Sequence, residues 1–218
     1  MPRLRQVPRA EASEAALKAY DRMFGDRDPV AEPGTSTGTP GNWWTVISLV
    51  PDVLTYFQRG GALYKGENRI IPPYYVELAL VRTGFAAGSQ FVFSQHCKGA
   101  RAAGISDEKV AAIPHWSATD LFDAAERAVL TYVDELVLSH GRVQDGTFQA
   151  LKSHFQDEAI LELTYISLLY LGYAIFTKAL RLEYDDVPER VVEIPVPGGG
   201  GAAKVDIMSQ MSGDATKS

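Results

Sequence analysis

The chain has 218 residues, 46% of them hydrophobic, which is enough to fill the core of one generous domain or two small ones. Its formal net charge is −6, and no segment interleaves lysine or arginine with aromatic residues, so we expect no binding to nucleic acid. The single cysteine excludes an intrachain disulfide. The first twenty residues hold no apolar core of a signal sequence, and we therefore expect a cytoplasmic protein.

The N-terminal quarter predicts two helical regions separated by a loop. Residues 10–24 repeat apolar positions at helical spacing and predict an amphipathic first helix. Residues 25–42 are rich in glycine, proline, serine and threonine, so we expect an exposed surface loop or a lid. An apolar helical pattern then resumes, is interrupted near Pro51 and is expected to end at Gly60–Gly61.

The middle of the chain predicts a pair of core helices. Residues 71–88 open with prolines suited to a first helical turn and end in a glycine suited to a helix stop. Residues 89–103 form the next expected helix, with Ser89 as its N-cap and Gly104 as its terminator. A short helix then starts near Asp107, whose acidic side chain is favourable at that end of the helix dipole.

The second half continues the helical pattern. Asp123 and Glu126 form an expected capping box before a long helix that ends at Gly141, and a shorter helix follows. Only residues 189–197 suggest a strand, which is short and limited by its prolines. The tail, 196–218, lacks the apolar density to fold alone, so we expect it to be flexible or to lie on a neighbour.

One segment, 159–181, is apolar enough to raise the question of a membrane. Glu162 and Lys178 near its ends and several internal polar residues favour a helix buried on nearly all sides over one that faces lipid, so we expect no membrane contact. The pattern as a whole predicts an all-α fold of about seven or eight helices in a single domain, 1–195. Because an isolated bundle cannot easily hide such a helix on every side, we expect a homo-oligomer.

His96 and Cys97 are adjacent and invite interpretation as a reactive thiol with its base. Consecutive helical residues point about 100° apart, so the two side chains do not enter one narrow site from a regular helix. Free cysteine is often simply a small buried hydrophobe, and packing is the simpler interpretation of Cys97. Buried histidine, in contrast, needs hydrogen-bond partners for its ring nitrogens.

Glu77 is the expected partner of His96. It stands among apolar residues of the preceding helix, and both residues lie at a similar distance from the expected turn at Gly88, so antiparallel packing places them at similar heights. Such a pair can hold a proton ready for transfer, and it can equally be a static structural tie. The spacing leaves both interpretations open.

The stretch "IPPYYVELALVRTGFAAGSQFVFSQHCKGARAAGISDEKVAAI" resembles the carboxymuconolactone decarboxylase-like family, which includes alkyl hydroperoxidase D. Two downstream stretches extend the resemblance to about residues 45–186. By this resemblance, the family's glutamate falls on Glu77 and its helix histidine on His96. The resemblance also implies an all-α bundle that assembles into trimers or hexamers.

The departures from the family pattern concern its redox and acidic residues. In the peroxidatic branch a Cys-x-x-Cys pair precedes the histidine, and its two positions here are Ser89 and Val92. The decarboxylase branch often has an acidic residue at the second of these positions. Cys97 matches no family cysteine, and a disulfide-forming cycle needs a second thiol.

These observations lead to one main hypothesis and two alternatives. The first is a non-redox lyase, decarboxylase or isomerase that acts on a small carbonyl or lactone compound, with His96 as general acid/base and Glu77 as its partner. The second is hydroperoxide reduction by Cys97 with an external thiol, and the third is a catalytically silent oligomeric binding or scaffold protein. We expect no cofactor and no metal. The weaker pocket-lining candidates are Ser89, Val92, Phe93, Tyr74, Trp43 and Trp44.

Overall fold

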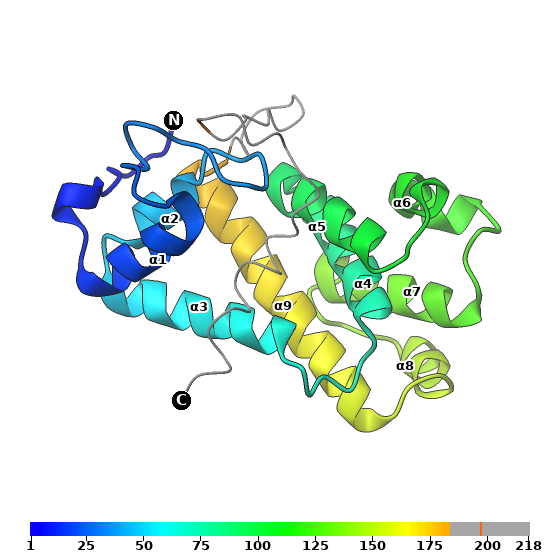
Figure 1. Ribbon diagram of the computed structural model, residues 1–218. Coiled ribbons are helices and arrows are strands. Elements are labelled where there is room, and N and C mark those ends of the chain that lie inside the picture. The colour runs from blue at the N-terminus through cyan, green and yellow to red at the C-terminus, as the bar shows by residue number, and fades with distance from the viewer. Residues whose placement is uncertain (184–196, 198–218) are drawn as a thin grey trace. The chain divides into compact units, whose positions relative to one another are not determined.

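The computed structural model describes residues 1–183 and Pro197, so all but one residue of the expected strand and of the expected tail lie outside the described residues. The described part of the chain contains nine α-helices, two short 3-10 helices and no strand (Figure 1), which confirms the all-α fold. Its residues form two compact units, Met1–Gly66 together with residues from Thr177 onward, and Glu67–Phe176. This division does not test the expectation of a single domain over 1–195, which stays a prediction.

The first unit contains the N-terminal helices and the last residues of α9. Ser13 caps α1, since its hydroxyl accepts a hydrogen bond from the amide of Ala16. The prediction of a helix end at Gly60–Gly61 is wrong, because α3 continues through both glycines to Lys65. Gly61 is buried, and glycine costs a helix only about 1 kcal/mol, so packing outweighs its low propensity. The elements of this unit are η1 (Arg9–Glu11), α1 (Glu14–Phe24), α2 (Asn42–Ile47) and α3 (Pro51–Lys65).

The segment between α1 and α2 differs from the expected exposed loop in its second half. Thr35, Thr37 and Thr39 are each at most 3% exposed. The Thr35 hydroxyl lies 2.8 Å from that of Thr37 and 2.9 Å from that of Thr39, so the three polar groups satisfy one another. Hydroxyls that find partners inside the protein can be buried at little cost. The prediction of surface exposure is therefore wrong for this part of 25–42.

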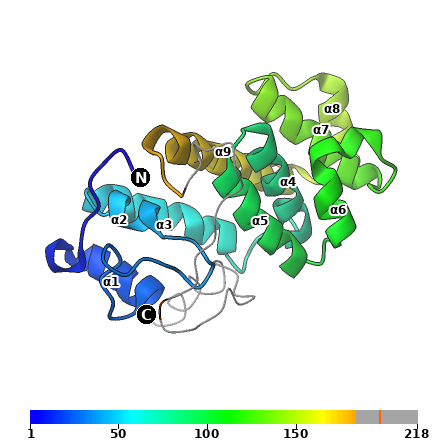
Figure 2. The same cartoon turned by 90° about the horizontal axis from the view of Figure 1, so that it is seen from above.

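The second unit contains the helix pair expected from the sequence. Helices α4 and α5 lie side by side in both views (Figures 1 and 2). Gly88 has φ +64° between them, as the predicted helix stop requires. The Asp123–Glu126 capping box at the start of α7 is also confirmed. The elements are α4 (Pro73–Ala86), α5 (Gln90–Ala102), α6 (Asp107–Ala112), η2 (Ile113–Ala118), α7 (Ala124–Leu138), α8 (Asp145–Lys152) and α9 (Asp157–Leu180) as far as Phe176.

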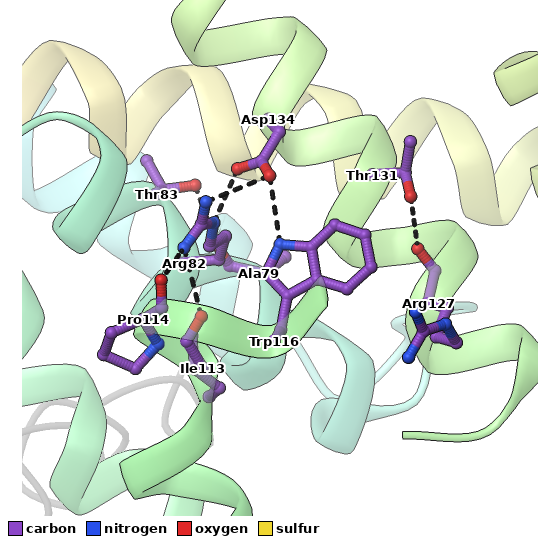
Figure 3. A network of polar contacts seen from close by, with 9 residues as sticks. All are labelled: Ala79, Arg82, Thr83, Ile113, Pro114, Trp116, Arg127, Thr131 and Asp134. Atoms are coloured by element: carbon purple, nitrogen blue, oxygen red, sulfur yellow. Dashed lines mark hydrogen bonds and ion pairs between the residues drawn. The ribbon is translucent and has the colours of Figure 1, made fainter. Parts of the chain in front are cut away.

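An ion pair joins α4, η2 and α7 (Figure 3). Arg82 donates from Nε and Nη2 to the two oxygens of Asp134, at 2.5 and 3.0 Å. Its Nη1 also donates to the carbonyl oxygens of Ile113 and Pro114, at 3.1 and 2.9 Å. Trp116 Nε1 donates to Asp134 at 3.0 Å. A bidentate pair of this kind adds geometric specificity to the contact between α7 and α4, the helix that carries Glu77.

Helix α9 is less buried within the chain than its apolar sequence suggests. Among the described residues it is the one helix long and apolar enough to cross a membrane, and 33% of its most apolar window is buried. Core helices of water-soluble proteins pass the same test. Leu161 and Ile175 are 70% and 61% exposed, so the expectation of burial on nearly all sides is not met by this chain alone.

Candidate functional site

Glu77 and His96 meet across the α4–α5 pair. The Ser89 hydroxyl accepts from the Val92 amide at 3.2 Å and starts α5 immediately after the turn, which sets the register of this helix. His96 Nδ1 then lies 3.0 Å from Glu77 Oε2. The two residues therefore form the hydrogen bond expected from their similar distance to the turn, while their role in catalysis stays a prediction.

The pair is almost fully removed from solvent. Each of the two side chains, Glu77 and His96, is 7% exposed. In such surroundings a hydrogen bond between a carboxylate and an imidazole is electrostatically stronger than in water, and the two groups can share or pass one proton. When the carboxylate accepts from Nδ1–H, the lone pair of the neutral imidazole is on Nε2. This arrangement suits general acid–base chemistry.

Tyr170 of α9 is a third member of the site that the sequence did not reveal. Its ring packs edge-on against the His96 ring, with centroids 4.4 Å apart and an interplanar angle of 88°. Tyr173 continues the aromatic contact at 5.3 Å from Tyr170, and burial raises the pKa of its hydroxyl. Tyr170 lies in the apolar segment 159–181, but nothing local in the sequence indicates that it faces His96.

The nearer pocket candidates on α5 are mostly buried. Ser89 and Val92 are 1% and 3% exposed, and the hydroxyl of Ser89 serves as the helix cap described above. Phe93 is partly exposed and contacts the ring of Phe85, with centroids 6.0 Å apart. Cys97 is 8% exposed, so a peroxide in solution has little access to its thiol in this conformation.

Tyr74 belongs to a separate polar cluster. Its hydroxyl donates to Glu126, and Lys109 Nζ lies 2.5 Å from the same carboxylate and 3.3 Å from the tyrosine oxygen. Partial burial, with the hydrogen bond to Glu126, raises the pKa of Tyr74. This cluster links the starts of α4 and α7 to α6, so the Tyr74 hydroxyl is engaged in tying helices together.

Trp43 and Trp44 lie in the first unit. They stack on each other with centroids 4.2 Å apart, and Trp43 also contacts Phe57 at 4.5 Å. Both are buried, at 6% and 1% exposed. They pack in the core of their own unit, and a place in the substrate pocket stays a prediction for both. Within the described residues no group of three or more His, Cys, Asp or Glu side chains is placed to hold a metal ion.

A buried glutamate–histidine pair carried by two antiparallel helices is the candidate site of this α-helical chain. Residues 51–135, which include both helices, match the model of the carboxymuconolactone decarboxylase family. Over these residues the chain is similar to this family, and its helical fold is similar to that of the alkylhydroperoxidase AhpD-like proteins. No curated protein matches the sequence.

Solved structures resemble the chain in fold at low sequence identity. The debrominase Bmp8 in its apo form gives a TM-score of 0.64 at 16% identity, covering 94% of this chain and 96% of that one. An uncharacterized peroxidase-related protein from Ralstonia eutropha JMP134, described as an AhpD core, gives 0.60 at 15% identity, covering 82% and 93%. A putative antioxidant defence protein AhpD from Agrobacterium tumefaciens gives 0.56 at 20% identity, covering 66% and 94%.

Proposed function

We propose that the chain is a non-redox enzyme that moves a proton on a small carbonyl or lactone compound, as a lyase, decarboxylase or isomerase. The observation that carries this proposal is the 3.0 Å hydrogen bond between His96 Nδ1 and Glu77 Oε2 in nearly solvent-free surroundings. His96 is the general acid/base, and Glu77 holds its ring and stabilises the imidazolium that forms when Nε2 takes a proton.

In the proposed chemistry this pair serves as both proton acceptor and proton donor. In an isomerisation, His96 removes a proton from a carbon next to the carbonyl and returns it at another carbon, so the composition of the substrate is unchanged. In a decarboxylation, carbon dioxide leaves and His96 supplies the proton that replaces it. A relative in fold, the debrominase Bmp8, has been solved with 2,3,4-tribromopyrrole, which supports a compact ring compound as the size class of ligand.

Redox chemistry through Cys97 is the competing proposal, because several proteins of similar fold are described as AhpD or peroxidase-related. That chemistry would oxidise the thiolate of Cys97 to a sulfenic acid and needs an external thiol to reduce it. Cys97 is 8% exposed and the side chains of Glu77 and His96 are 7% exposed, so burial does not separate the two proposals. The single cysteine, which leaves no second thiol in the chain for a disulfide-forming cycle, is unfavourable to the redox alternative. A catalytically silent binding or scaffold protein is the further alternative.

Proton exchange tests the proposal without knowledge of the natural substrate. We would incubate the protein in deuterium oxide with small lactones and 3-oxo acids and follow the loss of the proton next to the carbonyl by NMR. Because general acid–base groups contribute about 10²–10⁴ in rate, His96→Asn and Glu77→Gln should each lower the exchange rate at least tenfold. Cys97→Ser is the control and should keep the wild-type rate.

The outcomes separate the three hypotheses. If the proton-exchange rate of His96→Asn stays within a few-fold of the wild-type rate, the acid–base proposal is contradicted. Rapid consumption of the thiol by hydroperoxide, together with loss of peroxidase activity in Cys97→Ser, favours the redox alternative. Binding of panel compounds with no exchange and no peroxide reduction favours a binding protein.

A further inference from the structure

Gly99 lies on α5 one helical turn after His96 and is buried. A methyl group added at its Cα would lie 2.5 Å from Glu77 Oε2, 2.7 Å from Cδ and 2.8 Å from Oε1. These distances are far below van der Waals contact, which is about 3.5 Å or more between heavy atoms. The carboxylate of Glu77 therefore occupies the space that any side chain at position 99 would fill.

Other helical glycines serve different purposes. At Gly84 an added methyl group would meet the backbone of the facing helix, 2.5 Å from Phe93 N, so that glycine allows the two helices to approach closely. At Gly172 and Gly146 an added methyl group meets nothing within 4 Å. Gly99 is distinguished from these glycines because its absent side chain makes room for one functional group.

The oxygen closest to Gly99 is the oxygen that pairs with His96. Glu77 Oε2 lies 3.0 Å from His96 Nδ1 and would lie 2.5 Å from a methyl group at position 99. To restore ordinary contact, the carboxylate has to move by about 1 Å, which is enough to lengthen or break a hydrogen bond of this length. The position of the carboxylate thus depends directly on the absence of a side chain at Gly99.

We infer that Gly99 is a positioning residue of the acid–base pair. It admits the Glu77 carboxylate to a notch in α5, where that carboxylate fixes the ring of His96 and keeps the proton of the neutral imidazole on Nδ1. Glycine lowers the stability of a helix interior by about 1 kcal/mol relative to alanine. At position 99 this loss accompanies the space that the Glu77 carboxylate occupies. The inference rests on the proposed function for its role in turnover, and on the structure alone for its effect on the histidine.

The experiment uses the full-length protein with ¹⁵N-labelled histidine, and the His96 signal is assigned by its loss in His96→Asn. We expect Nδ1 of His96 to carry the proton in wild type, and Gly99→Ala to shift the tautomer equilibrium toward Nε2–H. The group displaced is the end of a flexible side chain and alanine favours helix, so the variant should remain folded. Gly146→Ala, the same change on α8 where an added methyl group meets nothing within 4 Å, should keep the wild-type spectrum.

A wild-type tautomer in Gly99→Ala overturns the inference, whatever the activity. A shifted tautomer together with a proton-exchange rate at least tenfold below wild type supports both the inference and the proposed function. A shifted tautomer in a protein whose wild type exchanges no substrate proton supports the positioning role and counts against the proposed function. If Gly99→Ala does not fold, the double variant Glu77→Ala/Gly99→Ala lacks the clashing carboxylate and should fold; its failure to fold also overturns the inference.

Discussion

Glu183, immediately after α9, gives the protein an expected pH dependence of stability. Its side chain is fully buried in the first unit, and Oε1 accepts from the Trp43 amide at 3.4 Å. Burial raises its pKa from 4.5 to about 8, against the opposing effect of hydrogen bonds from residues of the α2 N-terminus and from Thr39. Burial outweighs these donors because it removes most of the hydration of the carboxylate.

The sign of the effect follows from the two pKa values. The folded state holds the Glu183 proton up to about pH 8, whereas the unfolded chain releases it near pH 4.5. Stability from this group is therefore complete below pH 4.5, declines as the pH rises, and is lost above about pH 8. Integrated from about pH 5 to about pH 8, the linkage amounts to a loss of about 3 kcal/mol in the free energy of unfolding.

Urea unfolding at several pH values measures this slope. In a Trp116→Phe background the remaining tryptophans are Trp43 and Trp44, so fluorescence reports the unit that holds Glu183. Glu183→Gln should remove the decline between about pH 5 and about pH 8, because glutamine does not ionise. Glu108→Gln, at an exposed carboxyl on α6, should keep it. Equal slopes with and without Glu183 would refute the reasoning.

Two further predictions concern packing and assembly. Asp134→Ala should lower the free energy of unfolding by about 3 kcal/mol in chemical denaturation, because it leaves the largely buried guanidinium of Arg82 without its carboxylate. A loss no larger than that of the exposed control Glu14→Ala would contradict this prediction. We propose that a second copy of the chain covers the exposed apolar residues of α9, so light scattering should show an oligomer that Leu161→Glu or Ile175→Glu dissociates. A monomeric wild type would contradict that proposal.

Local signals predicted the helix ends that depend on local chemistry. Ser89 and the Asp123–Glu126 box cap their helices as expected, because a side-chain oxygen near its own helix start needs no distant partner. The predicted helix end at Gly60–Gly61 was wrong because the continuation of α3 depends on distant packing and not on local chemistry. A glycine pair lowers helix propensity by an amount that packing elsewhere in the unit can exceed, and a single sequence does not show that packing.

The buried threonines between α1 and α2 illustrate the same limit for loops. Composition correctly indicated the absence of regular structure over most of 25–42, yet Thr35, Thr37 and Thr39 are buried because their hydroxyls pair with one another. Whether polar residues face water depends on whether they find partners inside, and partner geometry is a property of the folded loop.

In the candidate site, too, the contacts between neighbouring helices could be predicted from the sequence, whereas the contacts with distant segments could not. Glu77 and His96 could be paired from the sequence because both lie on helices joined by one tight turn, where counting residues gives relative height. Tyr170 reaches His96 from α9, and no count along the chain predicts that contact. Gly99 was visible only as one of several small residues. Its role emerges from the 2.5 Å between an absent methyl group and a carboxylate oxygen, because the meaning of a glycine is set by what occupies the space beside it.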